Sequence, residues 1–107
     1  MMKMFVELDM PYNQDEALWQ EVDSIFDEQK CSKDRQLNGS VLYTGNLNSN
    51  SNFTEFGVLF VKLSDNQKFM RHVKKWILFD NEDDESLPLQ ETDILKEIRE
   101  FKAKYRM

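Results

Sequence analysis

The sequence is poor in the residues from which many ligand sites are built. Its 107 residues include one cysteine, one histidine and three glycines. Because Cys31 has no second cysteine to pair with, no intrachain disulfide can form, and nothing indicates an oxidising compartment. No apolar run reaches the ~18 residues that a membrane span needs, and the first residues lack the apolar core of a secretory signal. We therefore expect a cytoplasmic protein with no cofactor.

The same scarcity argues against particular motifs. Zinc sites built from cysteine and histidine need about four such ligands, whereas this chain has only Cys31 and His72. The glycines are too scattered for a phosphate loop or a dinucleotide fingerprint. The acidic run at residues 80–85 lacks the mid-loop glycine of a calcium loop, because no glycine follows Gly57. We interpret this run as a solvated acidic loop.

The sequence does contain enough apolar material for one core, together with strongly segregated charge. Hydrophobic residues make up 40% of it, including eight Phe and two Trp, which argues against disorder despite 32% charged residues. The net charge is −6. Residues 1–28 hold eight acids and one base, and residues 80–93 hold seven acids and no base, so the rest is net basic. The acidic total disfavours direct nucleic-acid binding and favours a basic protein partner.

Two elements near the N-terminus follow from the apolar pattern. Residues 3–9 alternate in the way that is typical of a strand. A capping box at Asn13 and Glu16 precedes an apolar stripe at helical spacing, which predicts a helix over residues 14–30.

The middle of the chain contains two strand-like stretches, residues 37–47 and 53–63. Turn-forming residues at 46–52 separate them, so we predict an antiparallel hairpin. The second stretch is apolar on both sides, which predicts a central strand that is covered on both faces.

The last third of the chain is predicted to contain a short helix, a strand and a longer helix. A second capping box at Ser64 and Gln67 predicts a short helix as far as about Lys75. We predict a strand at 76–79, since that apolar run stops abruptly before an acidic loop. Residues 90–105 carry a helical apolar stripe, with acids early and bases late, as the helix dipole favours.

These elements predict a single α+β domain over residues 1–107, in the order β-α-β-β-α-β-α. The first six match a ferredoxin-like β-α-β-β-α-β antiparallel sheet, and an additional C-terminal helix follows. Two helices would cover one sheet face and leave the other open. The C-terminal helix could cover that face, as could a partner protein or a second copy in a homodimer.

The predicted helix at 14–30 carries the most distinctive polar feature, a stripe of carboxylates. Asp23 and Asp27 are a like-charge pair one turn apart, with no base nearby in sequence to relieve the repulsion. Either the stripe is a solvated face, neutralised in part by the basic segments, or it docks a basic partner. We predict a non-catalytic inhibitor, immunity or antitoxin-like protein that masks a nucleic-acid-binding surface. The predicted partner-binding residues are Glu16, Gln20, Asp23, Asp27, Asp83 and Asp84.

The alternative is catalytic and uses Asp9, at the end of the first strand. The run Phe5-Val6-Glu7-Leu8-Asp9 is similar to the strand end of small ferredoxin-like nucleases from prokaryotic defence systems. Those enzymes place a metal-binding aspartate there and pair it across a dimer. The resemblance covers this strand end alone, and it implies a small metal-dependent homodimeric nuclease or nucleotide hydrolase.

Two further groups have chemical potential in the sequence. Cys31 and His72 are the only residues that could form a cysteine–histidine nucleophile pair. Basic residues also gather between positions 62 and 75 and could contact phosphate, although solvated helix-face lysines are the simpler interpretation. These basic residues are Lys62, Lys68, Arg71, Lys74 and Lys75.

Overall fold

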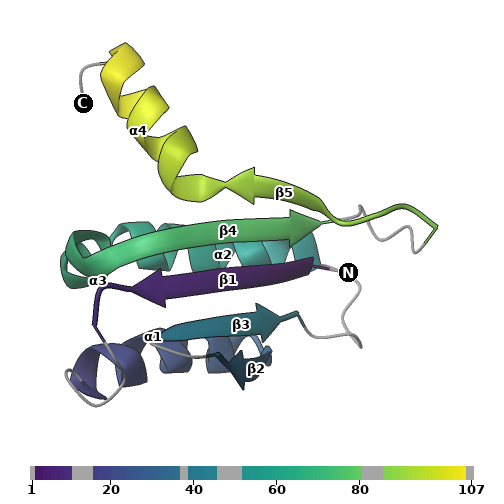
Figure 1. The fold of residues 1–107 in the computed structure, drawn as a ribbon. Helices are drawn as coiled ribbons and strands as arrows, with labels where there is room; N and C mark the ends of the chain where they lie inside the picture. Colours follow the sequence, from purple (N-terminus) through teal and green to yellow (C-terminus); the bar gives the residue numbers. More distant parts are fainter. Residues whose placement is uncertain (1, 11–15, 37–38, 46–51, 81–85, 106–107) are drawn as a thin grey trace.

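The computed structural model describes residues 2–10, 16–36, 39–45, 52–80 and 86–105 (Figure 1). They form an α+β structure whose five antiparallel strands lie in the order β2-β3-β1-β4-β5. The strands are β1 (Met2–Leu8), β2 (Ser32–Arg35), β3 (Ser40–Thr44), β4 (Val73–Asp80) and β5 (Gln90–Asp93). The helices are α1 (Glu16–Glu28), α2 (Asn52–Ser64), α3 (Gln67–His72) and α4 (Ile94–Tyr105). The predicted α+β class with an antiparallel sheet is confirmed.

The central strand is β1, which confirms the strand predicted at residues 3–9. It pairs with β3 on one side and with β4 on the other. Its side chains alternate strictly, with Met4 and Val6 buried and Phe5 only partly buried. One face of β1 therefore belongs to the core, and the other faces away from it.

The prediction of a central strand at 53–63 is wrong, because this segment is helix α2. Phe56, Leu59 and Leu63 are almost fully buried, at the spacing of one helix face. Val58 and Val61, which would face the core in a two-sided strand, are exposed instead. Because residues 58–61 are all apolar, they satisfy the period of a strand and that of a helix equally well, so the pattern could not separate the two.

The next two elements follow the predicted order with shifted boundaries. Helix α3 has Asn66 as its N-cap, whose side chain accepts a hydrogen bond from the Phe69 amide at 3.0 Å. Ser64, the predicted cap, instead donates to the Val61 carbonyl at the end of α2. The strand predicted at 76–79 is confirmed as the middle of β4.

Two edge strands, β2 and β5, were not predicted. Their sequences are polar and all their side chains are exposed, so no apolar alternation marks them. Strand β5 occupies the first residues of the helix predicted at 90–105. Helix α4 begins one residue after β5, where the Asp93 side chain accepts a hydrogen bond from the Lys96 amide at 3.1 Å.

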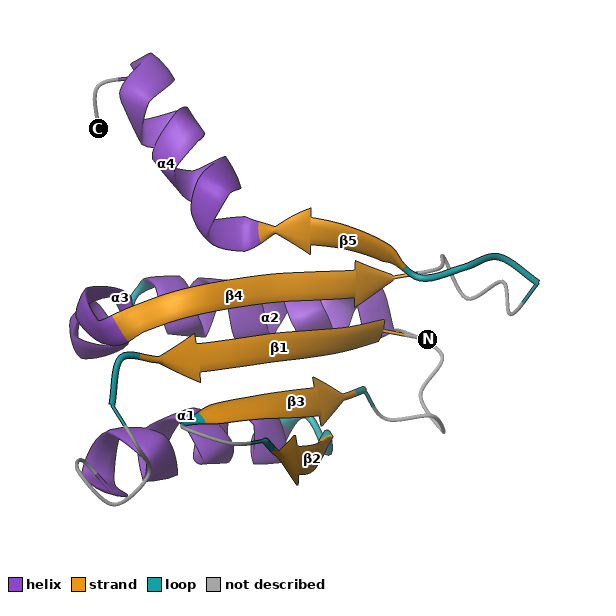
Figure 2. Cartoon of the chain, viewed as in Figure 1, coloured by secondary structure: helices purple, strands orange, loops and turns teal. Residues whose placement is uncertain are grey.

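The elements form two layers. Helices α1 and α2 lie behind the sheet, and no described helix covers the face toward the viewer, which we call the open face (Figure 1). Helix α4 leaves the sheet at its β5 edge rather than folding back over the open face (Figure 2). Across the open face, Phe5 lies in register with Leu42 and Ile77. None of the described helices has the length and hydrophobicity that crossing a lipid bilayer requires.

The core lies between the sheet and the helical layer. Trp76 is fully buried, and its indole N–H points at the Met4 sulfur at 3.0 Å. Phe69 packs edge-on against the Trp76 ring, with ring centroids 5.2 Å apart. Leu18 and Phe26 of α1 are also fully buried, so α1 is fixed against the sheet by its apolar stripe.

Candidate functional site: the two faces of helix α1

Helix α1 presents two chemically different faces. Its inner face packs on the sheet and contains Leu18, Trp19, Val22, Asp23 and Phe26. Its exposed face, which we call the outer face, contains Glu16, Ala17, Gln20, Glu21, Ser24, Asp27 and Glu28. Because the helix contains no lysine or arginine, all its charges are negative.

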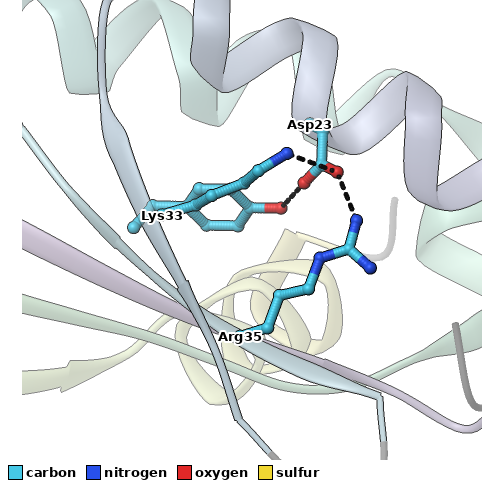
Figure 3. Close-up of polar contacts among 4 residues, drawn as sticks. Asp23, Lys33 and Arg35 are labelled. Atoms are coloured by element: carbon cyan, nitrogen blue, oxygen red, sulfur yellow. Dashed lines mark hydrogen bonds and ion pairs between the residues drawn. The ribbon is translucent and has the colours of Figure 1, made fainter.

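The predicted site residue Asp23 lies on the inner face and is only 7% exposed. The Tyr43 hydroxyl donates a 2.6 Å hydrogen bond to Asp23 Oδ1. Lys33 Nζ and an Arg35 guanidinium nitrogen lie 3.1 Å and 3.2 Å from Oδ2 (Figure 3). Both carboxylate oxygens are therefore used within the fold, and we leave Asp23 out of the docking surface.

Local structure explains how these partners reach Asp23. Lys30, two residues after the end of helix α1, has a φ of 58°. The amides of Lys30 and Cys31 donate back to Asp27 and Phe26, as in a Schellman cap. This cap turns the chain directly into β2. There the alternation of a strand places Lys33 and Arg35 on the same side of the sheet as α1.

The aromatic ring below Asp23 is held equally firmly. Tyr43 is 1% exposed and stacks on Phe26 of α1, with ring centroids 3.6 Å apart and planes nearly parallel. A tyrosine buried this deeply needs a partner for its hydroxyl, and Asp23 provides it. The basic segment thus neutralises Asp23, which also relieves its repulsion with Asp27 one turn later.

Three of the predicted site residues do lie on the outer face. Glu16, Gln20 and Asp27 are all exposed. At 100° per residue they lie within about 40° of one another around the helix axis. Among the residues that the structure describes, no ion pair involves Glu16 or Asp27. Their charges are therefore open to solvent or to a partner.

A shallow groove of about 510 Å³ runs along the outer face, beside the start of α3. Ala17, Ser24 and Ile25 give it a floor of small and apolar side chains, while Gln20 supplies a polar edge. At its end, the Asn66 side chain donates a 3.2 Å hydrogen bond to Glu21. The groove therefore has apolar surface next to carboxylates, which is the composition of a partner-binding face.

The remaining acid on the outer face and the remaining predicted acids do not add to this surface. Glu28, which was not among the predicted site residues, pairs with Lys62 of α2. Both side chains are about half exposed, so this surface ion pair contributes little stability. Asp83 and Asp84, which were predicted to join the docking surface, lie outside the described residues.

The alternative site residue, Asp9, follows the end of β1 and has an unexpected partner. Asp9 Oδ1 lies 3.0 Å from His72 Nδ1, and the Asp9 amide donates to the His72 carbonyl at 2.9 Å. The two residues are 63 positions apart in sequence, so spacing could not reveal the pair. Within the described part of the chain, no group of three or more histidine, cysteine or acidic side chains is arranged to hold a metal.

Comparison with known proteins adds no further information. No protein-family model matches the chain, and no curated protein or solved structure matches it. The function proposed below therefore depends on geometry and charge.

Proposed function

We propose that this protein is a non-catalytic interaction protein that binds a basic surface of a partner protein through the outer face of α1. The main observation in support is that Glu16 and Asp27 are exposed and form no ion pair with the described residues. The helix on which they lie has no cation. Asp23 on the same helix is neutralised internally. Such a face attracts a basic partner and fixes its orientation. An inhibitor, immunity or antitoxin role, masking a nucleic-acid-binding surface, fits the size and the charge.

The groove supplies what charge alone lacks. Interfaces derive most of their affinity from a desolvated centre and less from charged rims. The floor formed by Ala17, Ser24 and Ile25 offers such a centre, and Glu21 supplies a carboxylate at its rim. Glu16 and Asp27 lie on the same exposed face of α1. We therefore expect a partner that inserts a side chain into the groove while its basic residues meet the carboxylates.

The electrostatic part is tested with a charge reversal. Partners captured from the native host on the wild-type chain are measured against the double variant Glu16→Lys/Asp27→Lys at low and high salt. We expect the reversal to abolish capture, and salt to weaken wild-type binding. The double variant Glu97→Lys/Glu100→Lys on α4 has the same change in net charge and serves as the matched control. Equal loss with both variants, or binding that does not respond to salt, would contradict the proposal.

The groove is tested without changing any charge. Ser24→Trp fills the groove from an exposed position, so the fold should be retained while partner binding is lost. Thermal unfolding confirms the fold. If Ser24→Trp binds as the wild type does, the partner does not use the groove.

We also propose that strands β1–β4 with helices α1–α3 have the ferredoxin-like arrangement. Both β1 and β2 are antiparallel to β3, so they run parallel with β3 between them. Likewise β3 and β4 run parallel with β1 between them. Two interleaved split β-α-β units result. Strand β5 and helix α4 would then be an extension at the β4 edge.

The second candidate is the metal-dependent homodimeric nuclease or nucleotide hydrolase. One observation favours it: Asp9 is half exposed and holds the only histidine of the chain by a direct contact. Asp9→Asn should then abolish any Mg²⁺- or Mn²⁺-dependent cleavage while leaving the fold intact. Light scattering that shows a monomer, together with no metal binding, would count against this candidate. The cytoplasmic setting stays a prediction in either case.

A further inference from the structure

A cavity of about 140 Å³ lies where β4, β5 and the start of α4 meet. It is separate from the groove on α1. Four cationic side chains and two apolar ones line it, together with the Asp93 carboxylate. The cations are Lys74, Lys75, Lys96 and Arg99, and the apolar residues are Ile77 and Leu95.

The sheet register places this cavity on the open face. Trp76 is buried on the helix side of β4, so the alternation of a strand puts Lys75 and Ile77 on the opposite side. Ile77 is in register with Asp93 of β5, and α4 starts at the next residue. The cations therefore come from two separate elements, β4 and α4, that the fold brings together.

The charge around this cavity is largely uncompensated. Four cations against one carboxylate leave a formal charge of +3, in a protein whose total is −6. Lys74 lies 3.5 Å from Glu7, which relieves part of this charge. For Lys75, Lys96 and Arg99, the described residues provide no ion pair. Like charges gathered without partners repel one another, and an anion bound among them would relieve that repulsion.

We propose that this cavity is a binding site for a phosphate group. Its volume of about 140 Å³ leaves room for one tetrahedral oxyanion. Arg99 offers a planar pair of donors that matches phosphate oxygens, and the lysines add point charges. Ile77 and Leu95 form an apolar floor, and this strengthens the electrostatic attraction at the site. The site is independent of the function proposed for α1.

Asp93 has two opposing roles at this site. Its side chain caps α4 by accepting the Lys96 amide, and it is the one negative charge in the lining. Asparagine is an equally good N-cap but carries no charge. The substitution Asp93→Asn should therefore keep the helix and tighten phosphate binding, an effect that removing a merely structural residue would not produce.

The test uses the full chain and follows backbone amide signals by NMR during titration with inorganic phosphate at constant ionic strength. We expect saturable shifts confined to the amides of Lys75, Ile77, Leu95 and Lys96 and their neighbours. In the double variant Lys96→Ala/Arg99→Ala, the Kd should rise by about tenfold or more. In Asp93→Asn it should fall.

The matched control removes two cations from the helical layer, in the variant Lys62→Ala/Lys68→Ala. Weakening confined to Lys96→Ala/Arg99→Ala supports the site, whereas equal weakening in both variants shows general attraction to charge and overturns it. Shifts that do not saturate, or unchanged affinity in Asp93→Asn, also overturn it. Parallel titrations with a nucleoside monophosphate and a short single-stranded oligonucleotide distinguish the sources of the phosphate. Tighter binding than that of inorganic phosphate identifies the larger molecule that carries the group.

Discussion

The inner and outer faces of the helical layer differ in a way that residue polarity alone would not predict. The inner face of α1 buries a carboxylate, Asp23, among aromatic and aliphatic side chains. On α2, the side that faces away from the core leaves Val58 and Val61 exposed. Helix geometry therefore decides which positions are buried, and the partners present at each position then decide whether burial is tolerated. For Asp23 those partners are one hydroxyl and two cations.

The largest expected difference between the two faces is on α2. Leu59 is fully buried, so Leu59→Ala should lower the free energy of unfolding by about 2–5 kcal/mol, because it leaves a cavity in the core. Val61 is 54% exposed, and Val61→Ala should change stability by less than about 0.5 kcal/mol. Urea unfolding of the two variants measures both values. Comparable losses would mean that residues 53–63 are buried on two sides, as the sequence analysis predicted.

The second difference is between Asp23 and Asp27, one turn apart on α1. Asp23→Ala should cost about 2–3 kcal/mol, because the buried Tyr43 hydroxyl loses its acceptor. Lys33 and Arg35 are half exposed and can return to water, so they add little to this loss. Asp27→Ala should stay within about 0.5 kcal/mol of the wild type.

The same pair of variants also separates stability from binding. Asp27→Ala should weaken partner capture without lowering the melting temperature. Asp23→Ala should lower the melting temperature. At temperatures where this variant is still folded, its affinity for the partner should be unchanged. The reverse result, a stable Asp23→Ala chain that no longer binds, would return Asp23 to the docking surface.

A smaller loss is expected from Tyr43→Phe. The stacking on Phe26 is kept, but the buried Asp23 carboxylate loses one hydrogen bond. Because a hydrogen bond to a charged group is involved, we expect a loss of about 1.5 kcal/mol. The double variant Tyr43→Phe/Asp23→Ala completes a double-mutant cycle with the two single variants and isolates the coupling energy. Purely additive losses would mean that the two groups do not interact in solution.

Some elements of the fold could be predicted from the sequence and others could not, and the reasons are physical. The strand at 3–9 and the helix at 14–30 were predicted because each buries one face and exposes the other, which leaves a clear period. Helix α2 was missed because its outer face is apolar too. Strands β2 and β5 were missed because edge strands are held by backbone hydrogen bonds, which leave no side-chain pattern.

The candidate site could be predicted only in part. Its carboxylates lie in one continuous segment, whereas the residues that neutralise Asp23 come from other segments of the chain. The carboxylates on α1 follow directly from the helical period. The contacts that remove Asp23 from the surface come from β2 and β3, up to 20 residues away in sequence. The phosphate site was still less visible. Lys74 and Lys75 stood out in the sequence, but Lys96 and Arg99 join them only through the β4–β5 register and the start of α4.

The smallest expected effect tests the helical assignment of α2 at an exposed glycine. Gly57 is exposed in the middle of α2. Apart from its chain neighbours and the nearby backbone of its own helix, an added Cβ would meet no atom of the described residues within 4 Å. Because glycine in a helix interior costs more backbone entropy than alanine, Gly57→Ala should stabilise the protein by about 0.5–1 kcal/mol.

Valine at the same position distinguishes a helix from a strand. In a helix, the branched valine loses side-chain freedom against the preceding turn, so Gly57→Val should be less stable than Gly57→Ala. In a strand the order would reverse, since branched side chains pack well on a pleated surface. The alanine and valine variants share the same solvated site, so packing cancels from the comparison. A higher melting temperature for Gly57→Val than for Gly57→Ala would contradict the helix, and with it the distinction between inner and outer faces on α2.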